Sequence, residues 1–291
     1  SVRQALASSL NVPAVKIVTI IGLHQTYKIL QDIGLTNLRE PDYYGVSMAL
    51  GAVEVRLEDM ANAYRILANG GNWSPLQLTK NSSPDIDRDI HRDTRKSQSI
   101  FSPEASFIVS SILSDPNARS SGFGWDSPLD TPFWTAVKTG TSKDYRDNWC
   151  IGFSERYTVA VWAGDFDASP MQKVSGVTGA GPAWYEIMTE LHHSTESHAS
   201  AKPANIVSKE IRLPWTPRGY EEFFISGTEP TSTQIEVVDK KNIHFIFPSE
   251  GSVLIKDPHL DPKNIALSIR FSGSTPDGAL LYWDAKPLGA A

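Results

Sequence analysis

The sequence predicts an α+β protein in which helices lead into an antiparallel sheet flanked by helices, and a small all-β sandwich follows. Helical periodicity of apolar residues supports the first part, for example over residues 57–68 and 105–113. Runs rich in β-branched and aromatic residues, separated by short turns, begin at Thr135 and support the sheet. Beyond residue 214 the chain holds only short strand-like runs between turns, which is typical of a small β-sandwich.

Length and composition limit the classes of function. With 291 residues, the chain is long enough for two domains. The net charge of −6 and the lack of any basic cluster argue against nucleic-acid binding. No apolar run in the sequence reaches the length of a membrane-spanning helix. The one cysteine, Cys150, excludes an internal disulfide and predicts a buried, unreactive thiol.

The first helices are separated by polar or glycine breaks. Residues 2–7 are predicted to be helical. A second helix, with Pro13 near its first turn, is predicted to run through Val15 to Ile21, to be interrupted at Gly22 and to resume over Leu23 to Ile33. Asn11 can cap the helix that follows it, because a short amide side chain accepts a hydrogen bond from the first turn. Capping is therefore the alternative interpretation of the polar residues Ser9 and Asn11.

Two more helices are predicted over residues 57–68 and 103–113, each with an apolar face at helical spacing. Residues 43–55 contain glycines and small residues and predict a tight connection close to other backbone. Residues 79–99 are charged and polar and predict an exposed loop. Residues 116–132, rich in glycine, proline, serine and aspartate, predict another loop.

The strand predicted over residues 135–142 has the residues needed to bind an extended peptide. An edge strand leaves backbone N–H and C=O groups unpaired, so an extended peptide can add to it as one more strand. Gly140 lets that backbone approach closely. Lys138 and the hydroxyls of Thr139 and Thr141 supply a cation and hydrogen-bond donors for a carboxylate at the end of the peptide.

An antiparallel meander is predicted from the short spacing between this strand and two others, over residues 148–153 and 157–166. A helix beginning at Pro182 is expected to cover the sheet. The glycines at 179 and 181 do not indicate a phosphate site, because no Gly-Lys-Ser/Thr follows. The tryptophans of these elements are expected to be core aromatics: Trp149, Trp162 and Trp184.

The domain organisation predicted from composition is a first domain over residues 1–197, a linker over 198–213 and a β-sandwich over 214–291. Neither a metal site nor a cofactor is predicted, because no acidic residue or cysteine lies at ligand spacing from the histidines His192, His193 and His198. The strands of the sandwich are predicted at 234–238, 243–247, 252–255, 265–271 and 280–283.

Two short motifs together resemble a known family. Ser9-Leu10-Asn11 and Lys138-Thr139-Gly140-Thr141 are similar to the second and third motifs of the penicillin-recognising serine acyltransferases. The surrounding sequence resembles the transpeptidase domain of class A penicillin-binding proteins. That similarity is carried by Leu50-Gly51 with Glu54-Val55, Ala61-x-Ala63-Tyr64, Ala68-Asn69-Gly70-Gly71, Ser102-Pro103-Glu104, Asp144-Tyr145-Arg146-Asp147-Asn148-Trp149 and Gly179-Ala180-Gly181-Pro182-Ala183-Trp184.

The C-terminal part resembles the domain that ends penicillin-binding proteins of the 1C type. This similarity is carried by Phe224-Ile225-x-Gly227-Thr228-Glu229-Pro230, Pro248-x-x-Gly251 and Asp257-Pro258. It implies a partial serine β-lactamase-like transpeptidase fold followed by the sandwich. Because the family's chains continue for another strand or two, we expect the sandwich to be incomplete at Ala291.

The resemblance implies an acyl transfer in which a serine attacks the penultimate carbonyl of a D-Ala-D-Ala stem peptide, cross-linking peptidoglycan. Ser9, Lys138 and Thr141 would be catalytic: Ser9 would relay a proton, and the Thr141 N–H would supply half of the oxyanion hole. Asn11 would bind the substrate's amide backbone. With Lys138, Gly140 and Thr141, the Thr139 hydroxyl would complete the carboxylate site.

The partners implied are stem peptides and β-lactams, with cell-wall synthesis proteins as further partners of the C-terminal domain. The resemblance also implies the periplasmic face of a bacterial inner membrane, with a membrane anchor and a glycosyltransferase domain upstream of this chain. Nucleic acid and a cofactor are not expected.

One motif of the family is missing. Its nucleophile lies in a Ser-x-x-Lys tetrapeptide, which this sequence does not contain; the nearest match, Thr135-x-x-Lys138, opens the predicted edge strand. We therefore expect the nucleophile upstream of Ser1 and the isolated chain to be inactive. The alternative function is a non-catalytic penicillin- or peptide-binding module, or one that docks a partner.

Overall fold

A computed structural model describes residues 1–77, 96–124, 127–172, 174–212 and 219–231, together with four short strands nearer the C-terminus. The chain divides into two compact units, Ser1–Ile206 and Val207–Ala291. The division falls inside the predicted linker, residues 198–213. Each unit is described by itself.

The helices predicted over residues 2–7, on both sides of Gly22 and over 57–68 are confirmed. Residues 43–55, predicted as a tight connection close to other backbone, are largely helical turns instead, and a Cβ at Gly45 or Gly51 would meet no atom within 4 Å. The elements before the first loop are α1 (Val2–Ala7), α2 (Asn11–Ile21), α3 (Leu23–Asp32), α4 (Pro41–Tyr44), the 3-10 helix η1 (Gly45–Leu50) and α5 (Leu57–Ala68). The predicted cap is wrong: Leu10 occupies the N-cap position of α2, and Asn11 is its first helical residue. The apolar side chain of Leu10 cannot accept a backbone hydrogen bond, so α2 begins without a side-chain cap.

The segment predicted as a loop over residues 116–132 begins with a helix, α7 (Pro116–Phe123), which follows α6 (Pro103–Leu113). The carboxylate of Asp115 accepts a hydrogen bond of 3.0 Å from the Ala118 N–H and caps α7. Proline suits the first position of a helix because its missing N–H would have no partner there. The Asp115-Pro116 pair therefore starts a helix in spite of the glycines and serines that follow.

The predicted meander is confirmed as a three-stranded antiparallel sheet in the order β3–β4–β5, formed by β3 (Ala136–Thr141), β4 (Asp147–Phe153) and β5 (Thr158–Gly164). A short 3-10 turn, η2 (Lys143–Tyr145), joins β3 to β4. Lys138 is paired with Ile151, and Thr139 with Cys150. Since β3 pairs only with β4 among the described strands, its other edge is free to face a ligand.

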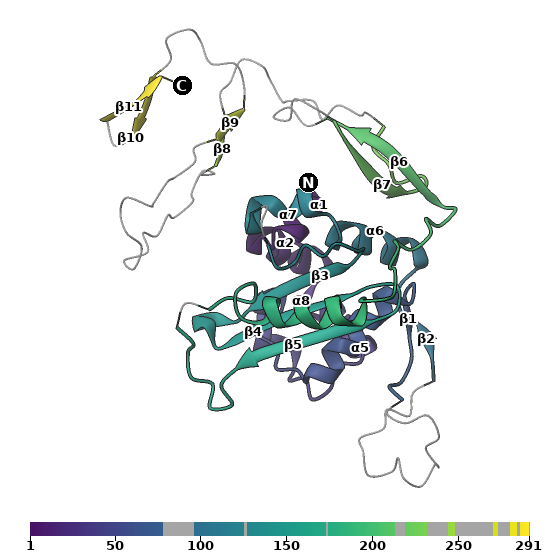
Figure 1. Cartoon of the computed structure of the whole chain (residues 1–291). Helices are drawn as coiled ribbons and strands as arrows, with labels where there is room; N and C mark the ends of the chain where they lie inside the picture. The colour runs from purple at the N-terminus through teal and green to yellow at the C-terminus, as the bar shows by residue number, and fades with distance from the viewer. Residues whose placement is uncertain are drawn as a thin grey trace. The chain divides into compact units, whose positions relative to one another are not determined.

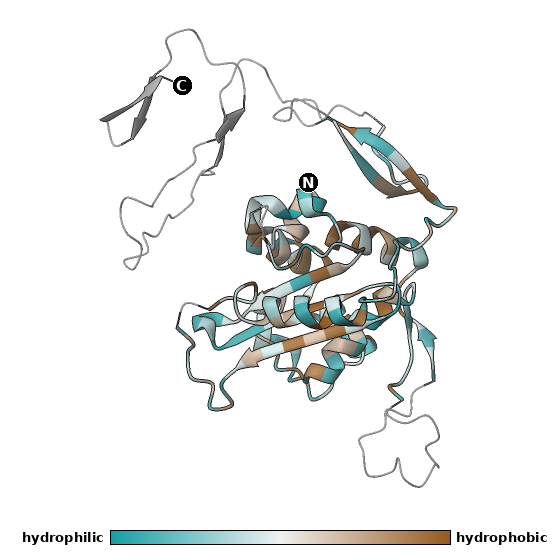
Figure 2. Ribbon diagram, in the orientation of Figure 1, coloured by the Kyte–Doolittle hydropathy of each residue, from teal (hydrophilic) through white to brown (hydrophobic). Residues whose placement is uncertain are grey.

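Two layers of helices enclose the sheet, with α8 (Ala180–Leu191) on one face and α5 and α6 on the other (Figure 1). On the α8 face, Val137 packs against Trp184 and Met188, and on the opposite face Ala136 packs against Leu113 and Phe153. Figure 2 shows apolar residues along the middle of β5, under α8. Both faces of β3 are thus packed against buried apolar clusters.

Helix α8 begins at Ala180, two residues before the predicted start at Pro182. Of the three tryptophans expected in the core, Trp184 is fully buried, whereas Trp149 and Trp162 are half-buried. Trp184 belongs to α8, and its ring packs over Gly152 of β4, whereas Trp149 and Trp162 are register partners on β4 and β5.

Residues 72–99 and the second unit contain short antiparallel pairs. Most of the predicted loop 79–99 lies outside the described residues, and its end forms β2 (Gln98–Ser99), which pairs with β1 (Asn72–Trp73). In the second unit β6 (Ile206–Ile211) pairs with β7 (Tyr220–Ile225), so part of the predicted linker is a strand. The remaining strands are β8 (His244–Phe247), β9 (Arg270–Ser272), β10 (Leu280–Trp283) and β11 (Lys286–Ala290).

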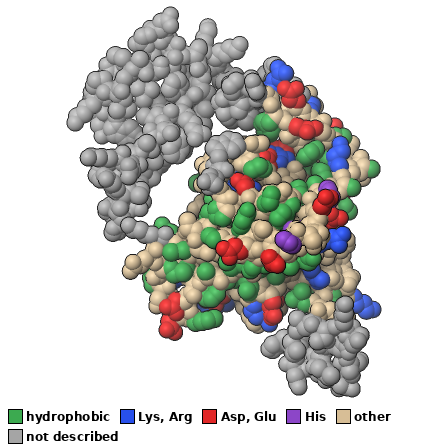
Figure 3. Space-filling view, viewed as in Figure 1, with side chains coloured by type: hydrophobic (Ala, Val, Ile, Leu, Met, Phe, Trp, Pro, Cys, Tyr) green, Lys and Arg blue, Asp and Glu red, His purple; other side chains and the backbone are tan. Residues whose placement is uncertain are grey.

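The predicted strands at 234–238 and 252–255 lie outside the described residues, while those near 243–247, 265–271 and 280–283 correspond to β8, β9 and β10. Within the described ranges, no helix has the length and apolar character needed to cross a bilayer. On the face that Figure 3 shows, lysine and arginine side chains are scattered among acidic ones outside the grey residues.

The packing of α8 on β4 gives the first prediction. A Cβ added at Gly152 would lie 2.6 Å from the Trp184 ring and 2.8 Å from the Ala136 carbonyl oxygen, whereas one added at Gly181 would meet atoms only at 3.4 Å. Gly152→Ala is expected to cost about 1–3 kcal/mol of unfolding free energy through overpacking, and Gly181→Ala much less. Urea unfolding of both variants measures this, and equal losses would contradict the close contact of α8 with β4.

Candidate functional site

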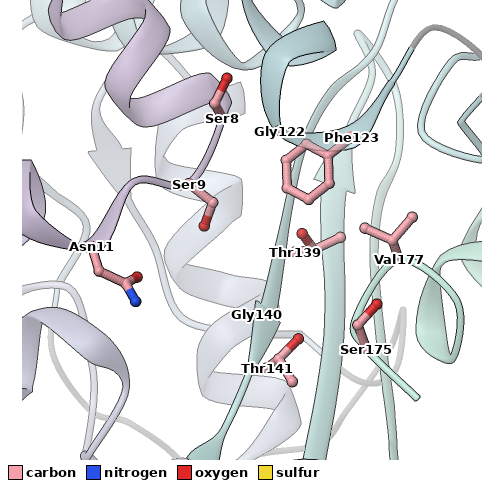
Figure 4. A pocket seen from close by; sticks show the side chains of 10 residues that line it. All are labelled: Ser8, Ser9, Asn11, Gly122, Phe123, Thr139, Gly140, Thr141, Ser175 and Val177. Carbon is pink, nitrogen blue, oxygen red and sulfur yellow. The ribbon is translucent and has the colours of Figure 1, made fainter. Parts of the chain in front are cut away.

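A pocket of about 530 Å³ lies along the free edge of β3 (Figure 4). Four segments surround it: the turn between α1 and α2, the end of α7, the strand β3, and the loop before α8. The residues that line it are Ser8, Ser9, Asn11, Gly122, Phe123, Thr139, Gly140, Thr141, Ser175 and Val177. The pocket therefore brings together the two motifs that the sequence places about 130 residues apart.

Lys138 and Ser9 are in direct contact. The Lys138 ammonium donates a hydrogen bond of 2.7 Å to the Ser9 Oγ and one of 2.6 Å to the backbone oxygen of Thr139. Burial lowers the pKa of Lys138 to about 8, because the charged form loses solvation in this environment. A lysine with such a pKa can hold or release a proton close to neutral pH, and its hydrogen-bond partner is a hydroxyl.

The alternation of side chains along β3 separates the cation from the two hydroxyls. Lys138 lies on the face that Ala136 shares with α6, while Thr139 and Thr141 lie on the face that Val137 shares with α8. Lys138 is not among the residues that line the pocket; its ammonium meets the pocket at Ser9. The sequence predicted that the lysine and the hydroxyls surround a ligand carboxylate together. In the structure the two hydroxyls lie in the pocket wall, and the ammonium lies next to Ser9.

The Thr141 hydroxyl is oriented by the loop before α8. Its oxygen accepts a hydrogen bond of 2.9 Å from the Gly176 N–H, which leaves the hydroxyl proton available to a ligand. A Cβ at Gly176 would lie 2.5 Å from the backbone oxygen of Gly140, so any larger residue would push this loop away from the strand. Gly176 is thus the point at which the loop and the pocket wall meet.

The N–H of Thr141 faces the free edge of the sheet. The next residue, Ser142, donates its N–H to the Asp147 carbonyl on the β4 side at 2.9 Å. Because successive N–H groups of a strand point to opposite edges, the Thr141 N–H points away from β4. A backbone donor at this position can stabilise an oxyanion in the pocket.

The turn that carries Ser9 is a Schellman motif, in which a helix ends with crossed backbone hydrogen bonds around a left-handed residue. The Leu10 N–H donates to the Ala5 carbonyl at 2.9 Å, and the Ser9 N–H donates to the Leu6 carbonyl at 3.1 Å. Ser9 has φ +58°, at a position that usually holds glycine. Glycine would adopt this conformation at lower cost, and the serine instead places a hydroxyl against the Lys138 ammonium.

Asn11 is exposed and lines the pocket, two residues along from Ser9. Cys150 is the register partner of Thr139 and is fully buried, as predicted, and burial raises the pKa of its thiol. In the described part of the chain, the side chains form no group of three metal-ligating residues. Of the three histidines, His192 donates or accepts through both ring nitrogens, at Thr195 and Ser154.

Sequence reasoning missed half of the pocket lining, namely Ser8, Gly122, Phe123, Ser175 and Val177. Gly122 and Phe123 end a helix that had been predicted as a loop, and the Asp115-Pro116 pair was the signal that could have revealed it. Ser175 and Val177 lie in an irregular loop, where no local pattern indicates which side chains face inward.

Comparisons with known proteins place these features in a family context. The family model described as "Penicillin binding protein transpeptidase domain" matches residues 1–188. Among curated relatives, penicillin-binding protein 1A from Clostridium botulinum is 31% identical over 79% of this chain and 29% of its own length. Penicillin-binding protein 1C from Escherichia coli is 33% identical over 62% of this chain and 22% of its own length. The chain thus spans less than a third of these relatives.

Solved structures share the fold. The crystal structure of penicillin-binding protein 1A from Haemophilus influenzae aligns with a TM-score of 0.64 at 24% identity, covering 79% of this chain and 40% of that one. PonA1 from Mycobacterium tuberculosis, solved in complex with penicillin V, aligns with a TM-score of 0.54 at 18% identity, covering 70% of this chain and 59% of that one.

The strained turn gives a prediction about stability. Ser9→Gly removes the Cβ that disfavours the left-handed conformation, whereas Ser9→Ala keeps it, and both lose the bond to Lys138. The glycine variant is expected to exceed the alanine variant by about 1 kcal/mol of unfolding free energy. Urea unfolding checks this. Equal stabilities would show that residue 9 does not adopt the left-handed conformation in solution.

Lys138 gives a prediction about pH. Its folded pKa of about 8 lies below the ordinary lysine value of 10.5. Between these two values the unfolded chain binds more protons, so the free energy of unfolding should rise with pH; below pH 8 the cost of burying the ammonium is present in full. Lys138→Met should lose this rise. Urea unfolding of both proteins from about pH 7 to 10 tests it, and parallel curves would contradict the lowered pKa.

Proposed function

The chain belongs to the transpeptidase family of penicillin-binding proteins, and on that premise we propose that it carries the substrate side of a serine D,D-transpeptidase site. The observation on which this proposal rests is the 2.7 Å hydrogen bond between Lys138 and Ser9 at the edge of the pocket along β3. The reaction is acyl transfer from a D-Ala-D-Ala stem peptide, which cross-links peptidoglycan.

The substrate lies along the free edge of β3 and adds to it as an extended strand. Its terminal carboxylate accepts hydrogen bonds from the hydroxyls of Thr139 and Thr141, with the positive charge of Lys138 nearby at Ser9. The Thr141 hydroxyl suits this role because Gly176 already occupies its acceptor side. Asn11 binds the amide backbone of the substrate from the opposite wall of the pocket (Figure 4).

Ser9 and Lys138 move the proton. When the serine nucleophile attacks the penultimate carbonyl, the C–N bond to the terminal D-alanine breaks and the leaving amine needs a proton. The Ser9 hydroxyl delivers one and is reprotonated by Lys138, whose pKa of about 8 matches this exchange. The Thr141 N–H stabilises the oxyanion together with a second donor, the backbone N–H of the nucleophile.

The nucleophile itself must come from a Ser-x-x-Lys segment, which this sequence does not contain. A second candidate function is a non-catalytic module that binds penicillins or stem peptides in the pocket along β3. We also propose that residues 214–291 form a β-sandwich of the penicillin-binding protein 1C type that docks cell-wall synthesis proteins, and that the site works at the periplasmic face of the inner membrane.

The test joins this chain to an upstream Ser-x-x-Lys segment and measures the rate of acylation by a fluorescent penicillin. Thr141→Val should lower the acylation efficiency by about 10- to 100-fold, because a hydrogen bond to a charged carboxylate is lost. Thr19→Val is the matched control, since the Thr19 hydroxyl bonds to the Val15 carbonyl of its own helix. An unchanged rate for Thr141→Val would remove that hydroxyl from the site.

The isolated 291-residue chain should form no stable adduct. A covalent adduct on it would contradict the need for an upstream nucleophile, and Ser9 would be the residue to examine first. Binding of a D-Ala-D-Ala peptide by the isolated chain, measured by calorimetry, separates the two candidate functions. Binding without acylation of the joined protein would favour the non-catalytic module.

A further inference from the structure

Ser9 depends on its neighbour Ser8 for its position. Ser8 is 6% exposed, and its hydroxyl donates a hydrogen bond of 2.8 Å to the carbonyl of Ala118 in α7. The Ser8 Oγ is also 2.7 Å from the Ser121 Oγ. Because the hydrogen of the Ser8 hydroxyl is already donated to the Ala118 carbonyl, the Ser121 hydroxyl is the donor in that second bond. The last residue before the left-handed serine is therefore fixed by two hydrogen bonds to a different helix.

Gly122 allows α7 to approach this turn. A Cβ at residue 122 would lie 2.7 Å from the Ser8 carbonyl oxygen and 3.0 Å from the Ser8 Cα. Both contacts are to backbone, so they could be relieved only by moving the turn away from the helix. The contact between Ser8 and α7 thus needs a hydroxyl at position 121 and no side chain at position 122.

Charged groups hold α7 and α1 together at the other end of this contact. Arg3 of α1 donates to the carboxylate of Asp115 at 3.3 Å and to the Ser111 carbonyl at 3.1 Å. Asp115 also caps α7. Arg119, 5% exposed, donates to the Leu113 carbonyl at 2.9 Å and to Asp130 at 2.8 Å. The helix to which Ser8 is hydrogen-bonded is therefore itself held in place by ion pairs and backbone hydrogen bonds.

We propose that Ser8, Ser121 and Gly122 are positioning residues that hold Ser9 in its left-handed conformation, with its hydroxyl on the Lys138 ammonium. None of the three transfers a proton or needs to contact the substrate for this role. They act by offsetting the strain at Ser9 and by fixing the direction of its side chain. That Ser9 matters for catalysis rests on the proposed function. The position of its side chain against Lys138 can be tested without any catalytic assay.

The test uses the isolated chain and a Ser9→Cys variant. A thiol held against the Lys138 ammonium should have a pKa at least about one unit below the ordinary 8.5, and should react with iodoacetamide about tenfold faster at pH 7 than an ordinary cysteine. The pH dependence of alkylation gives this pKa directly. Cys150 is fully buried, and the parent chain supplies its background rate. Lys138 is the ionisable side chain that hydrogen-bonds to residue 9 in the described part of the chain.

Ser8→Ala, Ser121→Ala and Gly122→Ala are then each combined with Ser9→Cys. Each is expected to raise the thiol pKa toward 8.5 and to remove most of the tenfold rate advantage. Ser120→Ala is the matched control, since its hydroxyl bonds only to the Asn117 carbonyl within α7, and it should leave the pKa unchanged. Gly122→Ala keeps both serine hydroxyls, so its effect separates displacement of the turn from loss of a hydrogen bond.

The outcomes distinguish the two proposals. A lowered thiol pKa that all three variants leave unchanged would overturn the positioning role while leaving the Ser9–Lys138 pair intact. An ordinary thiol pKa in Ser9→Cys alone would overturn the pair itself and, with it, the basis of the proposed function. Circular dichroism of each variant shows whether the fold is retained, and a variant that unfolds is replaced by Ser121→Gly, which removes the hydroxyl without adding a second thiol. A thiol pKa that a folded Ser121→Gly variant leaves as low as in Ser9→Cys alone would likewise count against the positioning role.

Discussion

The hydrogen bond between Lys138 and Ser9 joins the strand β3 to the turn after α1. The pocket depends on the positions of both. Lys138 is fixed because its strand is packed on both faces, by Trp184 and Met188 on one side and by Leu113 on the other. Ser9 is fixed because α1 is bonded to α7 at both ends, through Arg3 in its first turn and through Ser8 at its C-terminus. A shift of about 1 Å in either part would break the contact, since hydrogen bonds weaken steeply with distance and angle.

Strain and burial are both concentrated at this contact. Ser9 adopts a backbone conformation that glycine would adopt at lower cost, and Lys138 keeps an ammonium group in a poorly solvated place. Each cost is acceptable because the surrounding structure is over-determined by packing and by hydrogen bonds to backbone. Both features also suit proton transfer, because the hydroxyl has a fixed direction and the amine titrates near neutral pH. The structure therefore gives up stability at two residues that both belong to the site we propose.

Two glycines shape the remaining walls of the pocket, because they have no Cβ and so allow close approach of other backbone. Gly176 lets the loop before α8 touch the Gly140 backbone, and Gly122 lets α7 touch the turn at Ser8. In both places the absence of a Cβ brings a backbone donor or a helix close enough to orient a hydroxyl, that of Thr141 or that of Ser8. The pocket is therefore shaped as much by close backbone approach as by the side chains that carry the chemistry.

The sequence by itself determined the helices with strong apolar periodicity, the meander whose first strand carries Lys138, and the identity of the residues on that strand. These are local properties: spacing, capping residues and β-propensity act over a few positions. The opposite faces of Lys138 and the two threonine hydroxyls follow from the alternation of side chains along a strand, so the sequence already implied them. Only the tertiary structure decided that the Lys138 ammonium meets Ser9 and that α7 contacts Ser8. Those two features depend on contacts between residues more than a hundred positions apart, and neither periodicity nor capping patterns carry information over that distance.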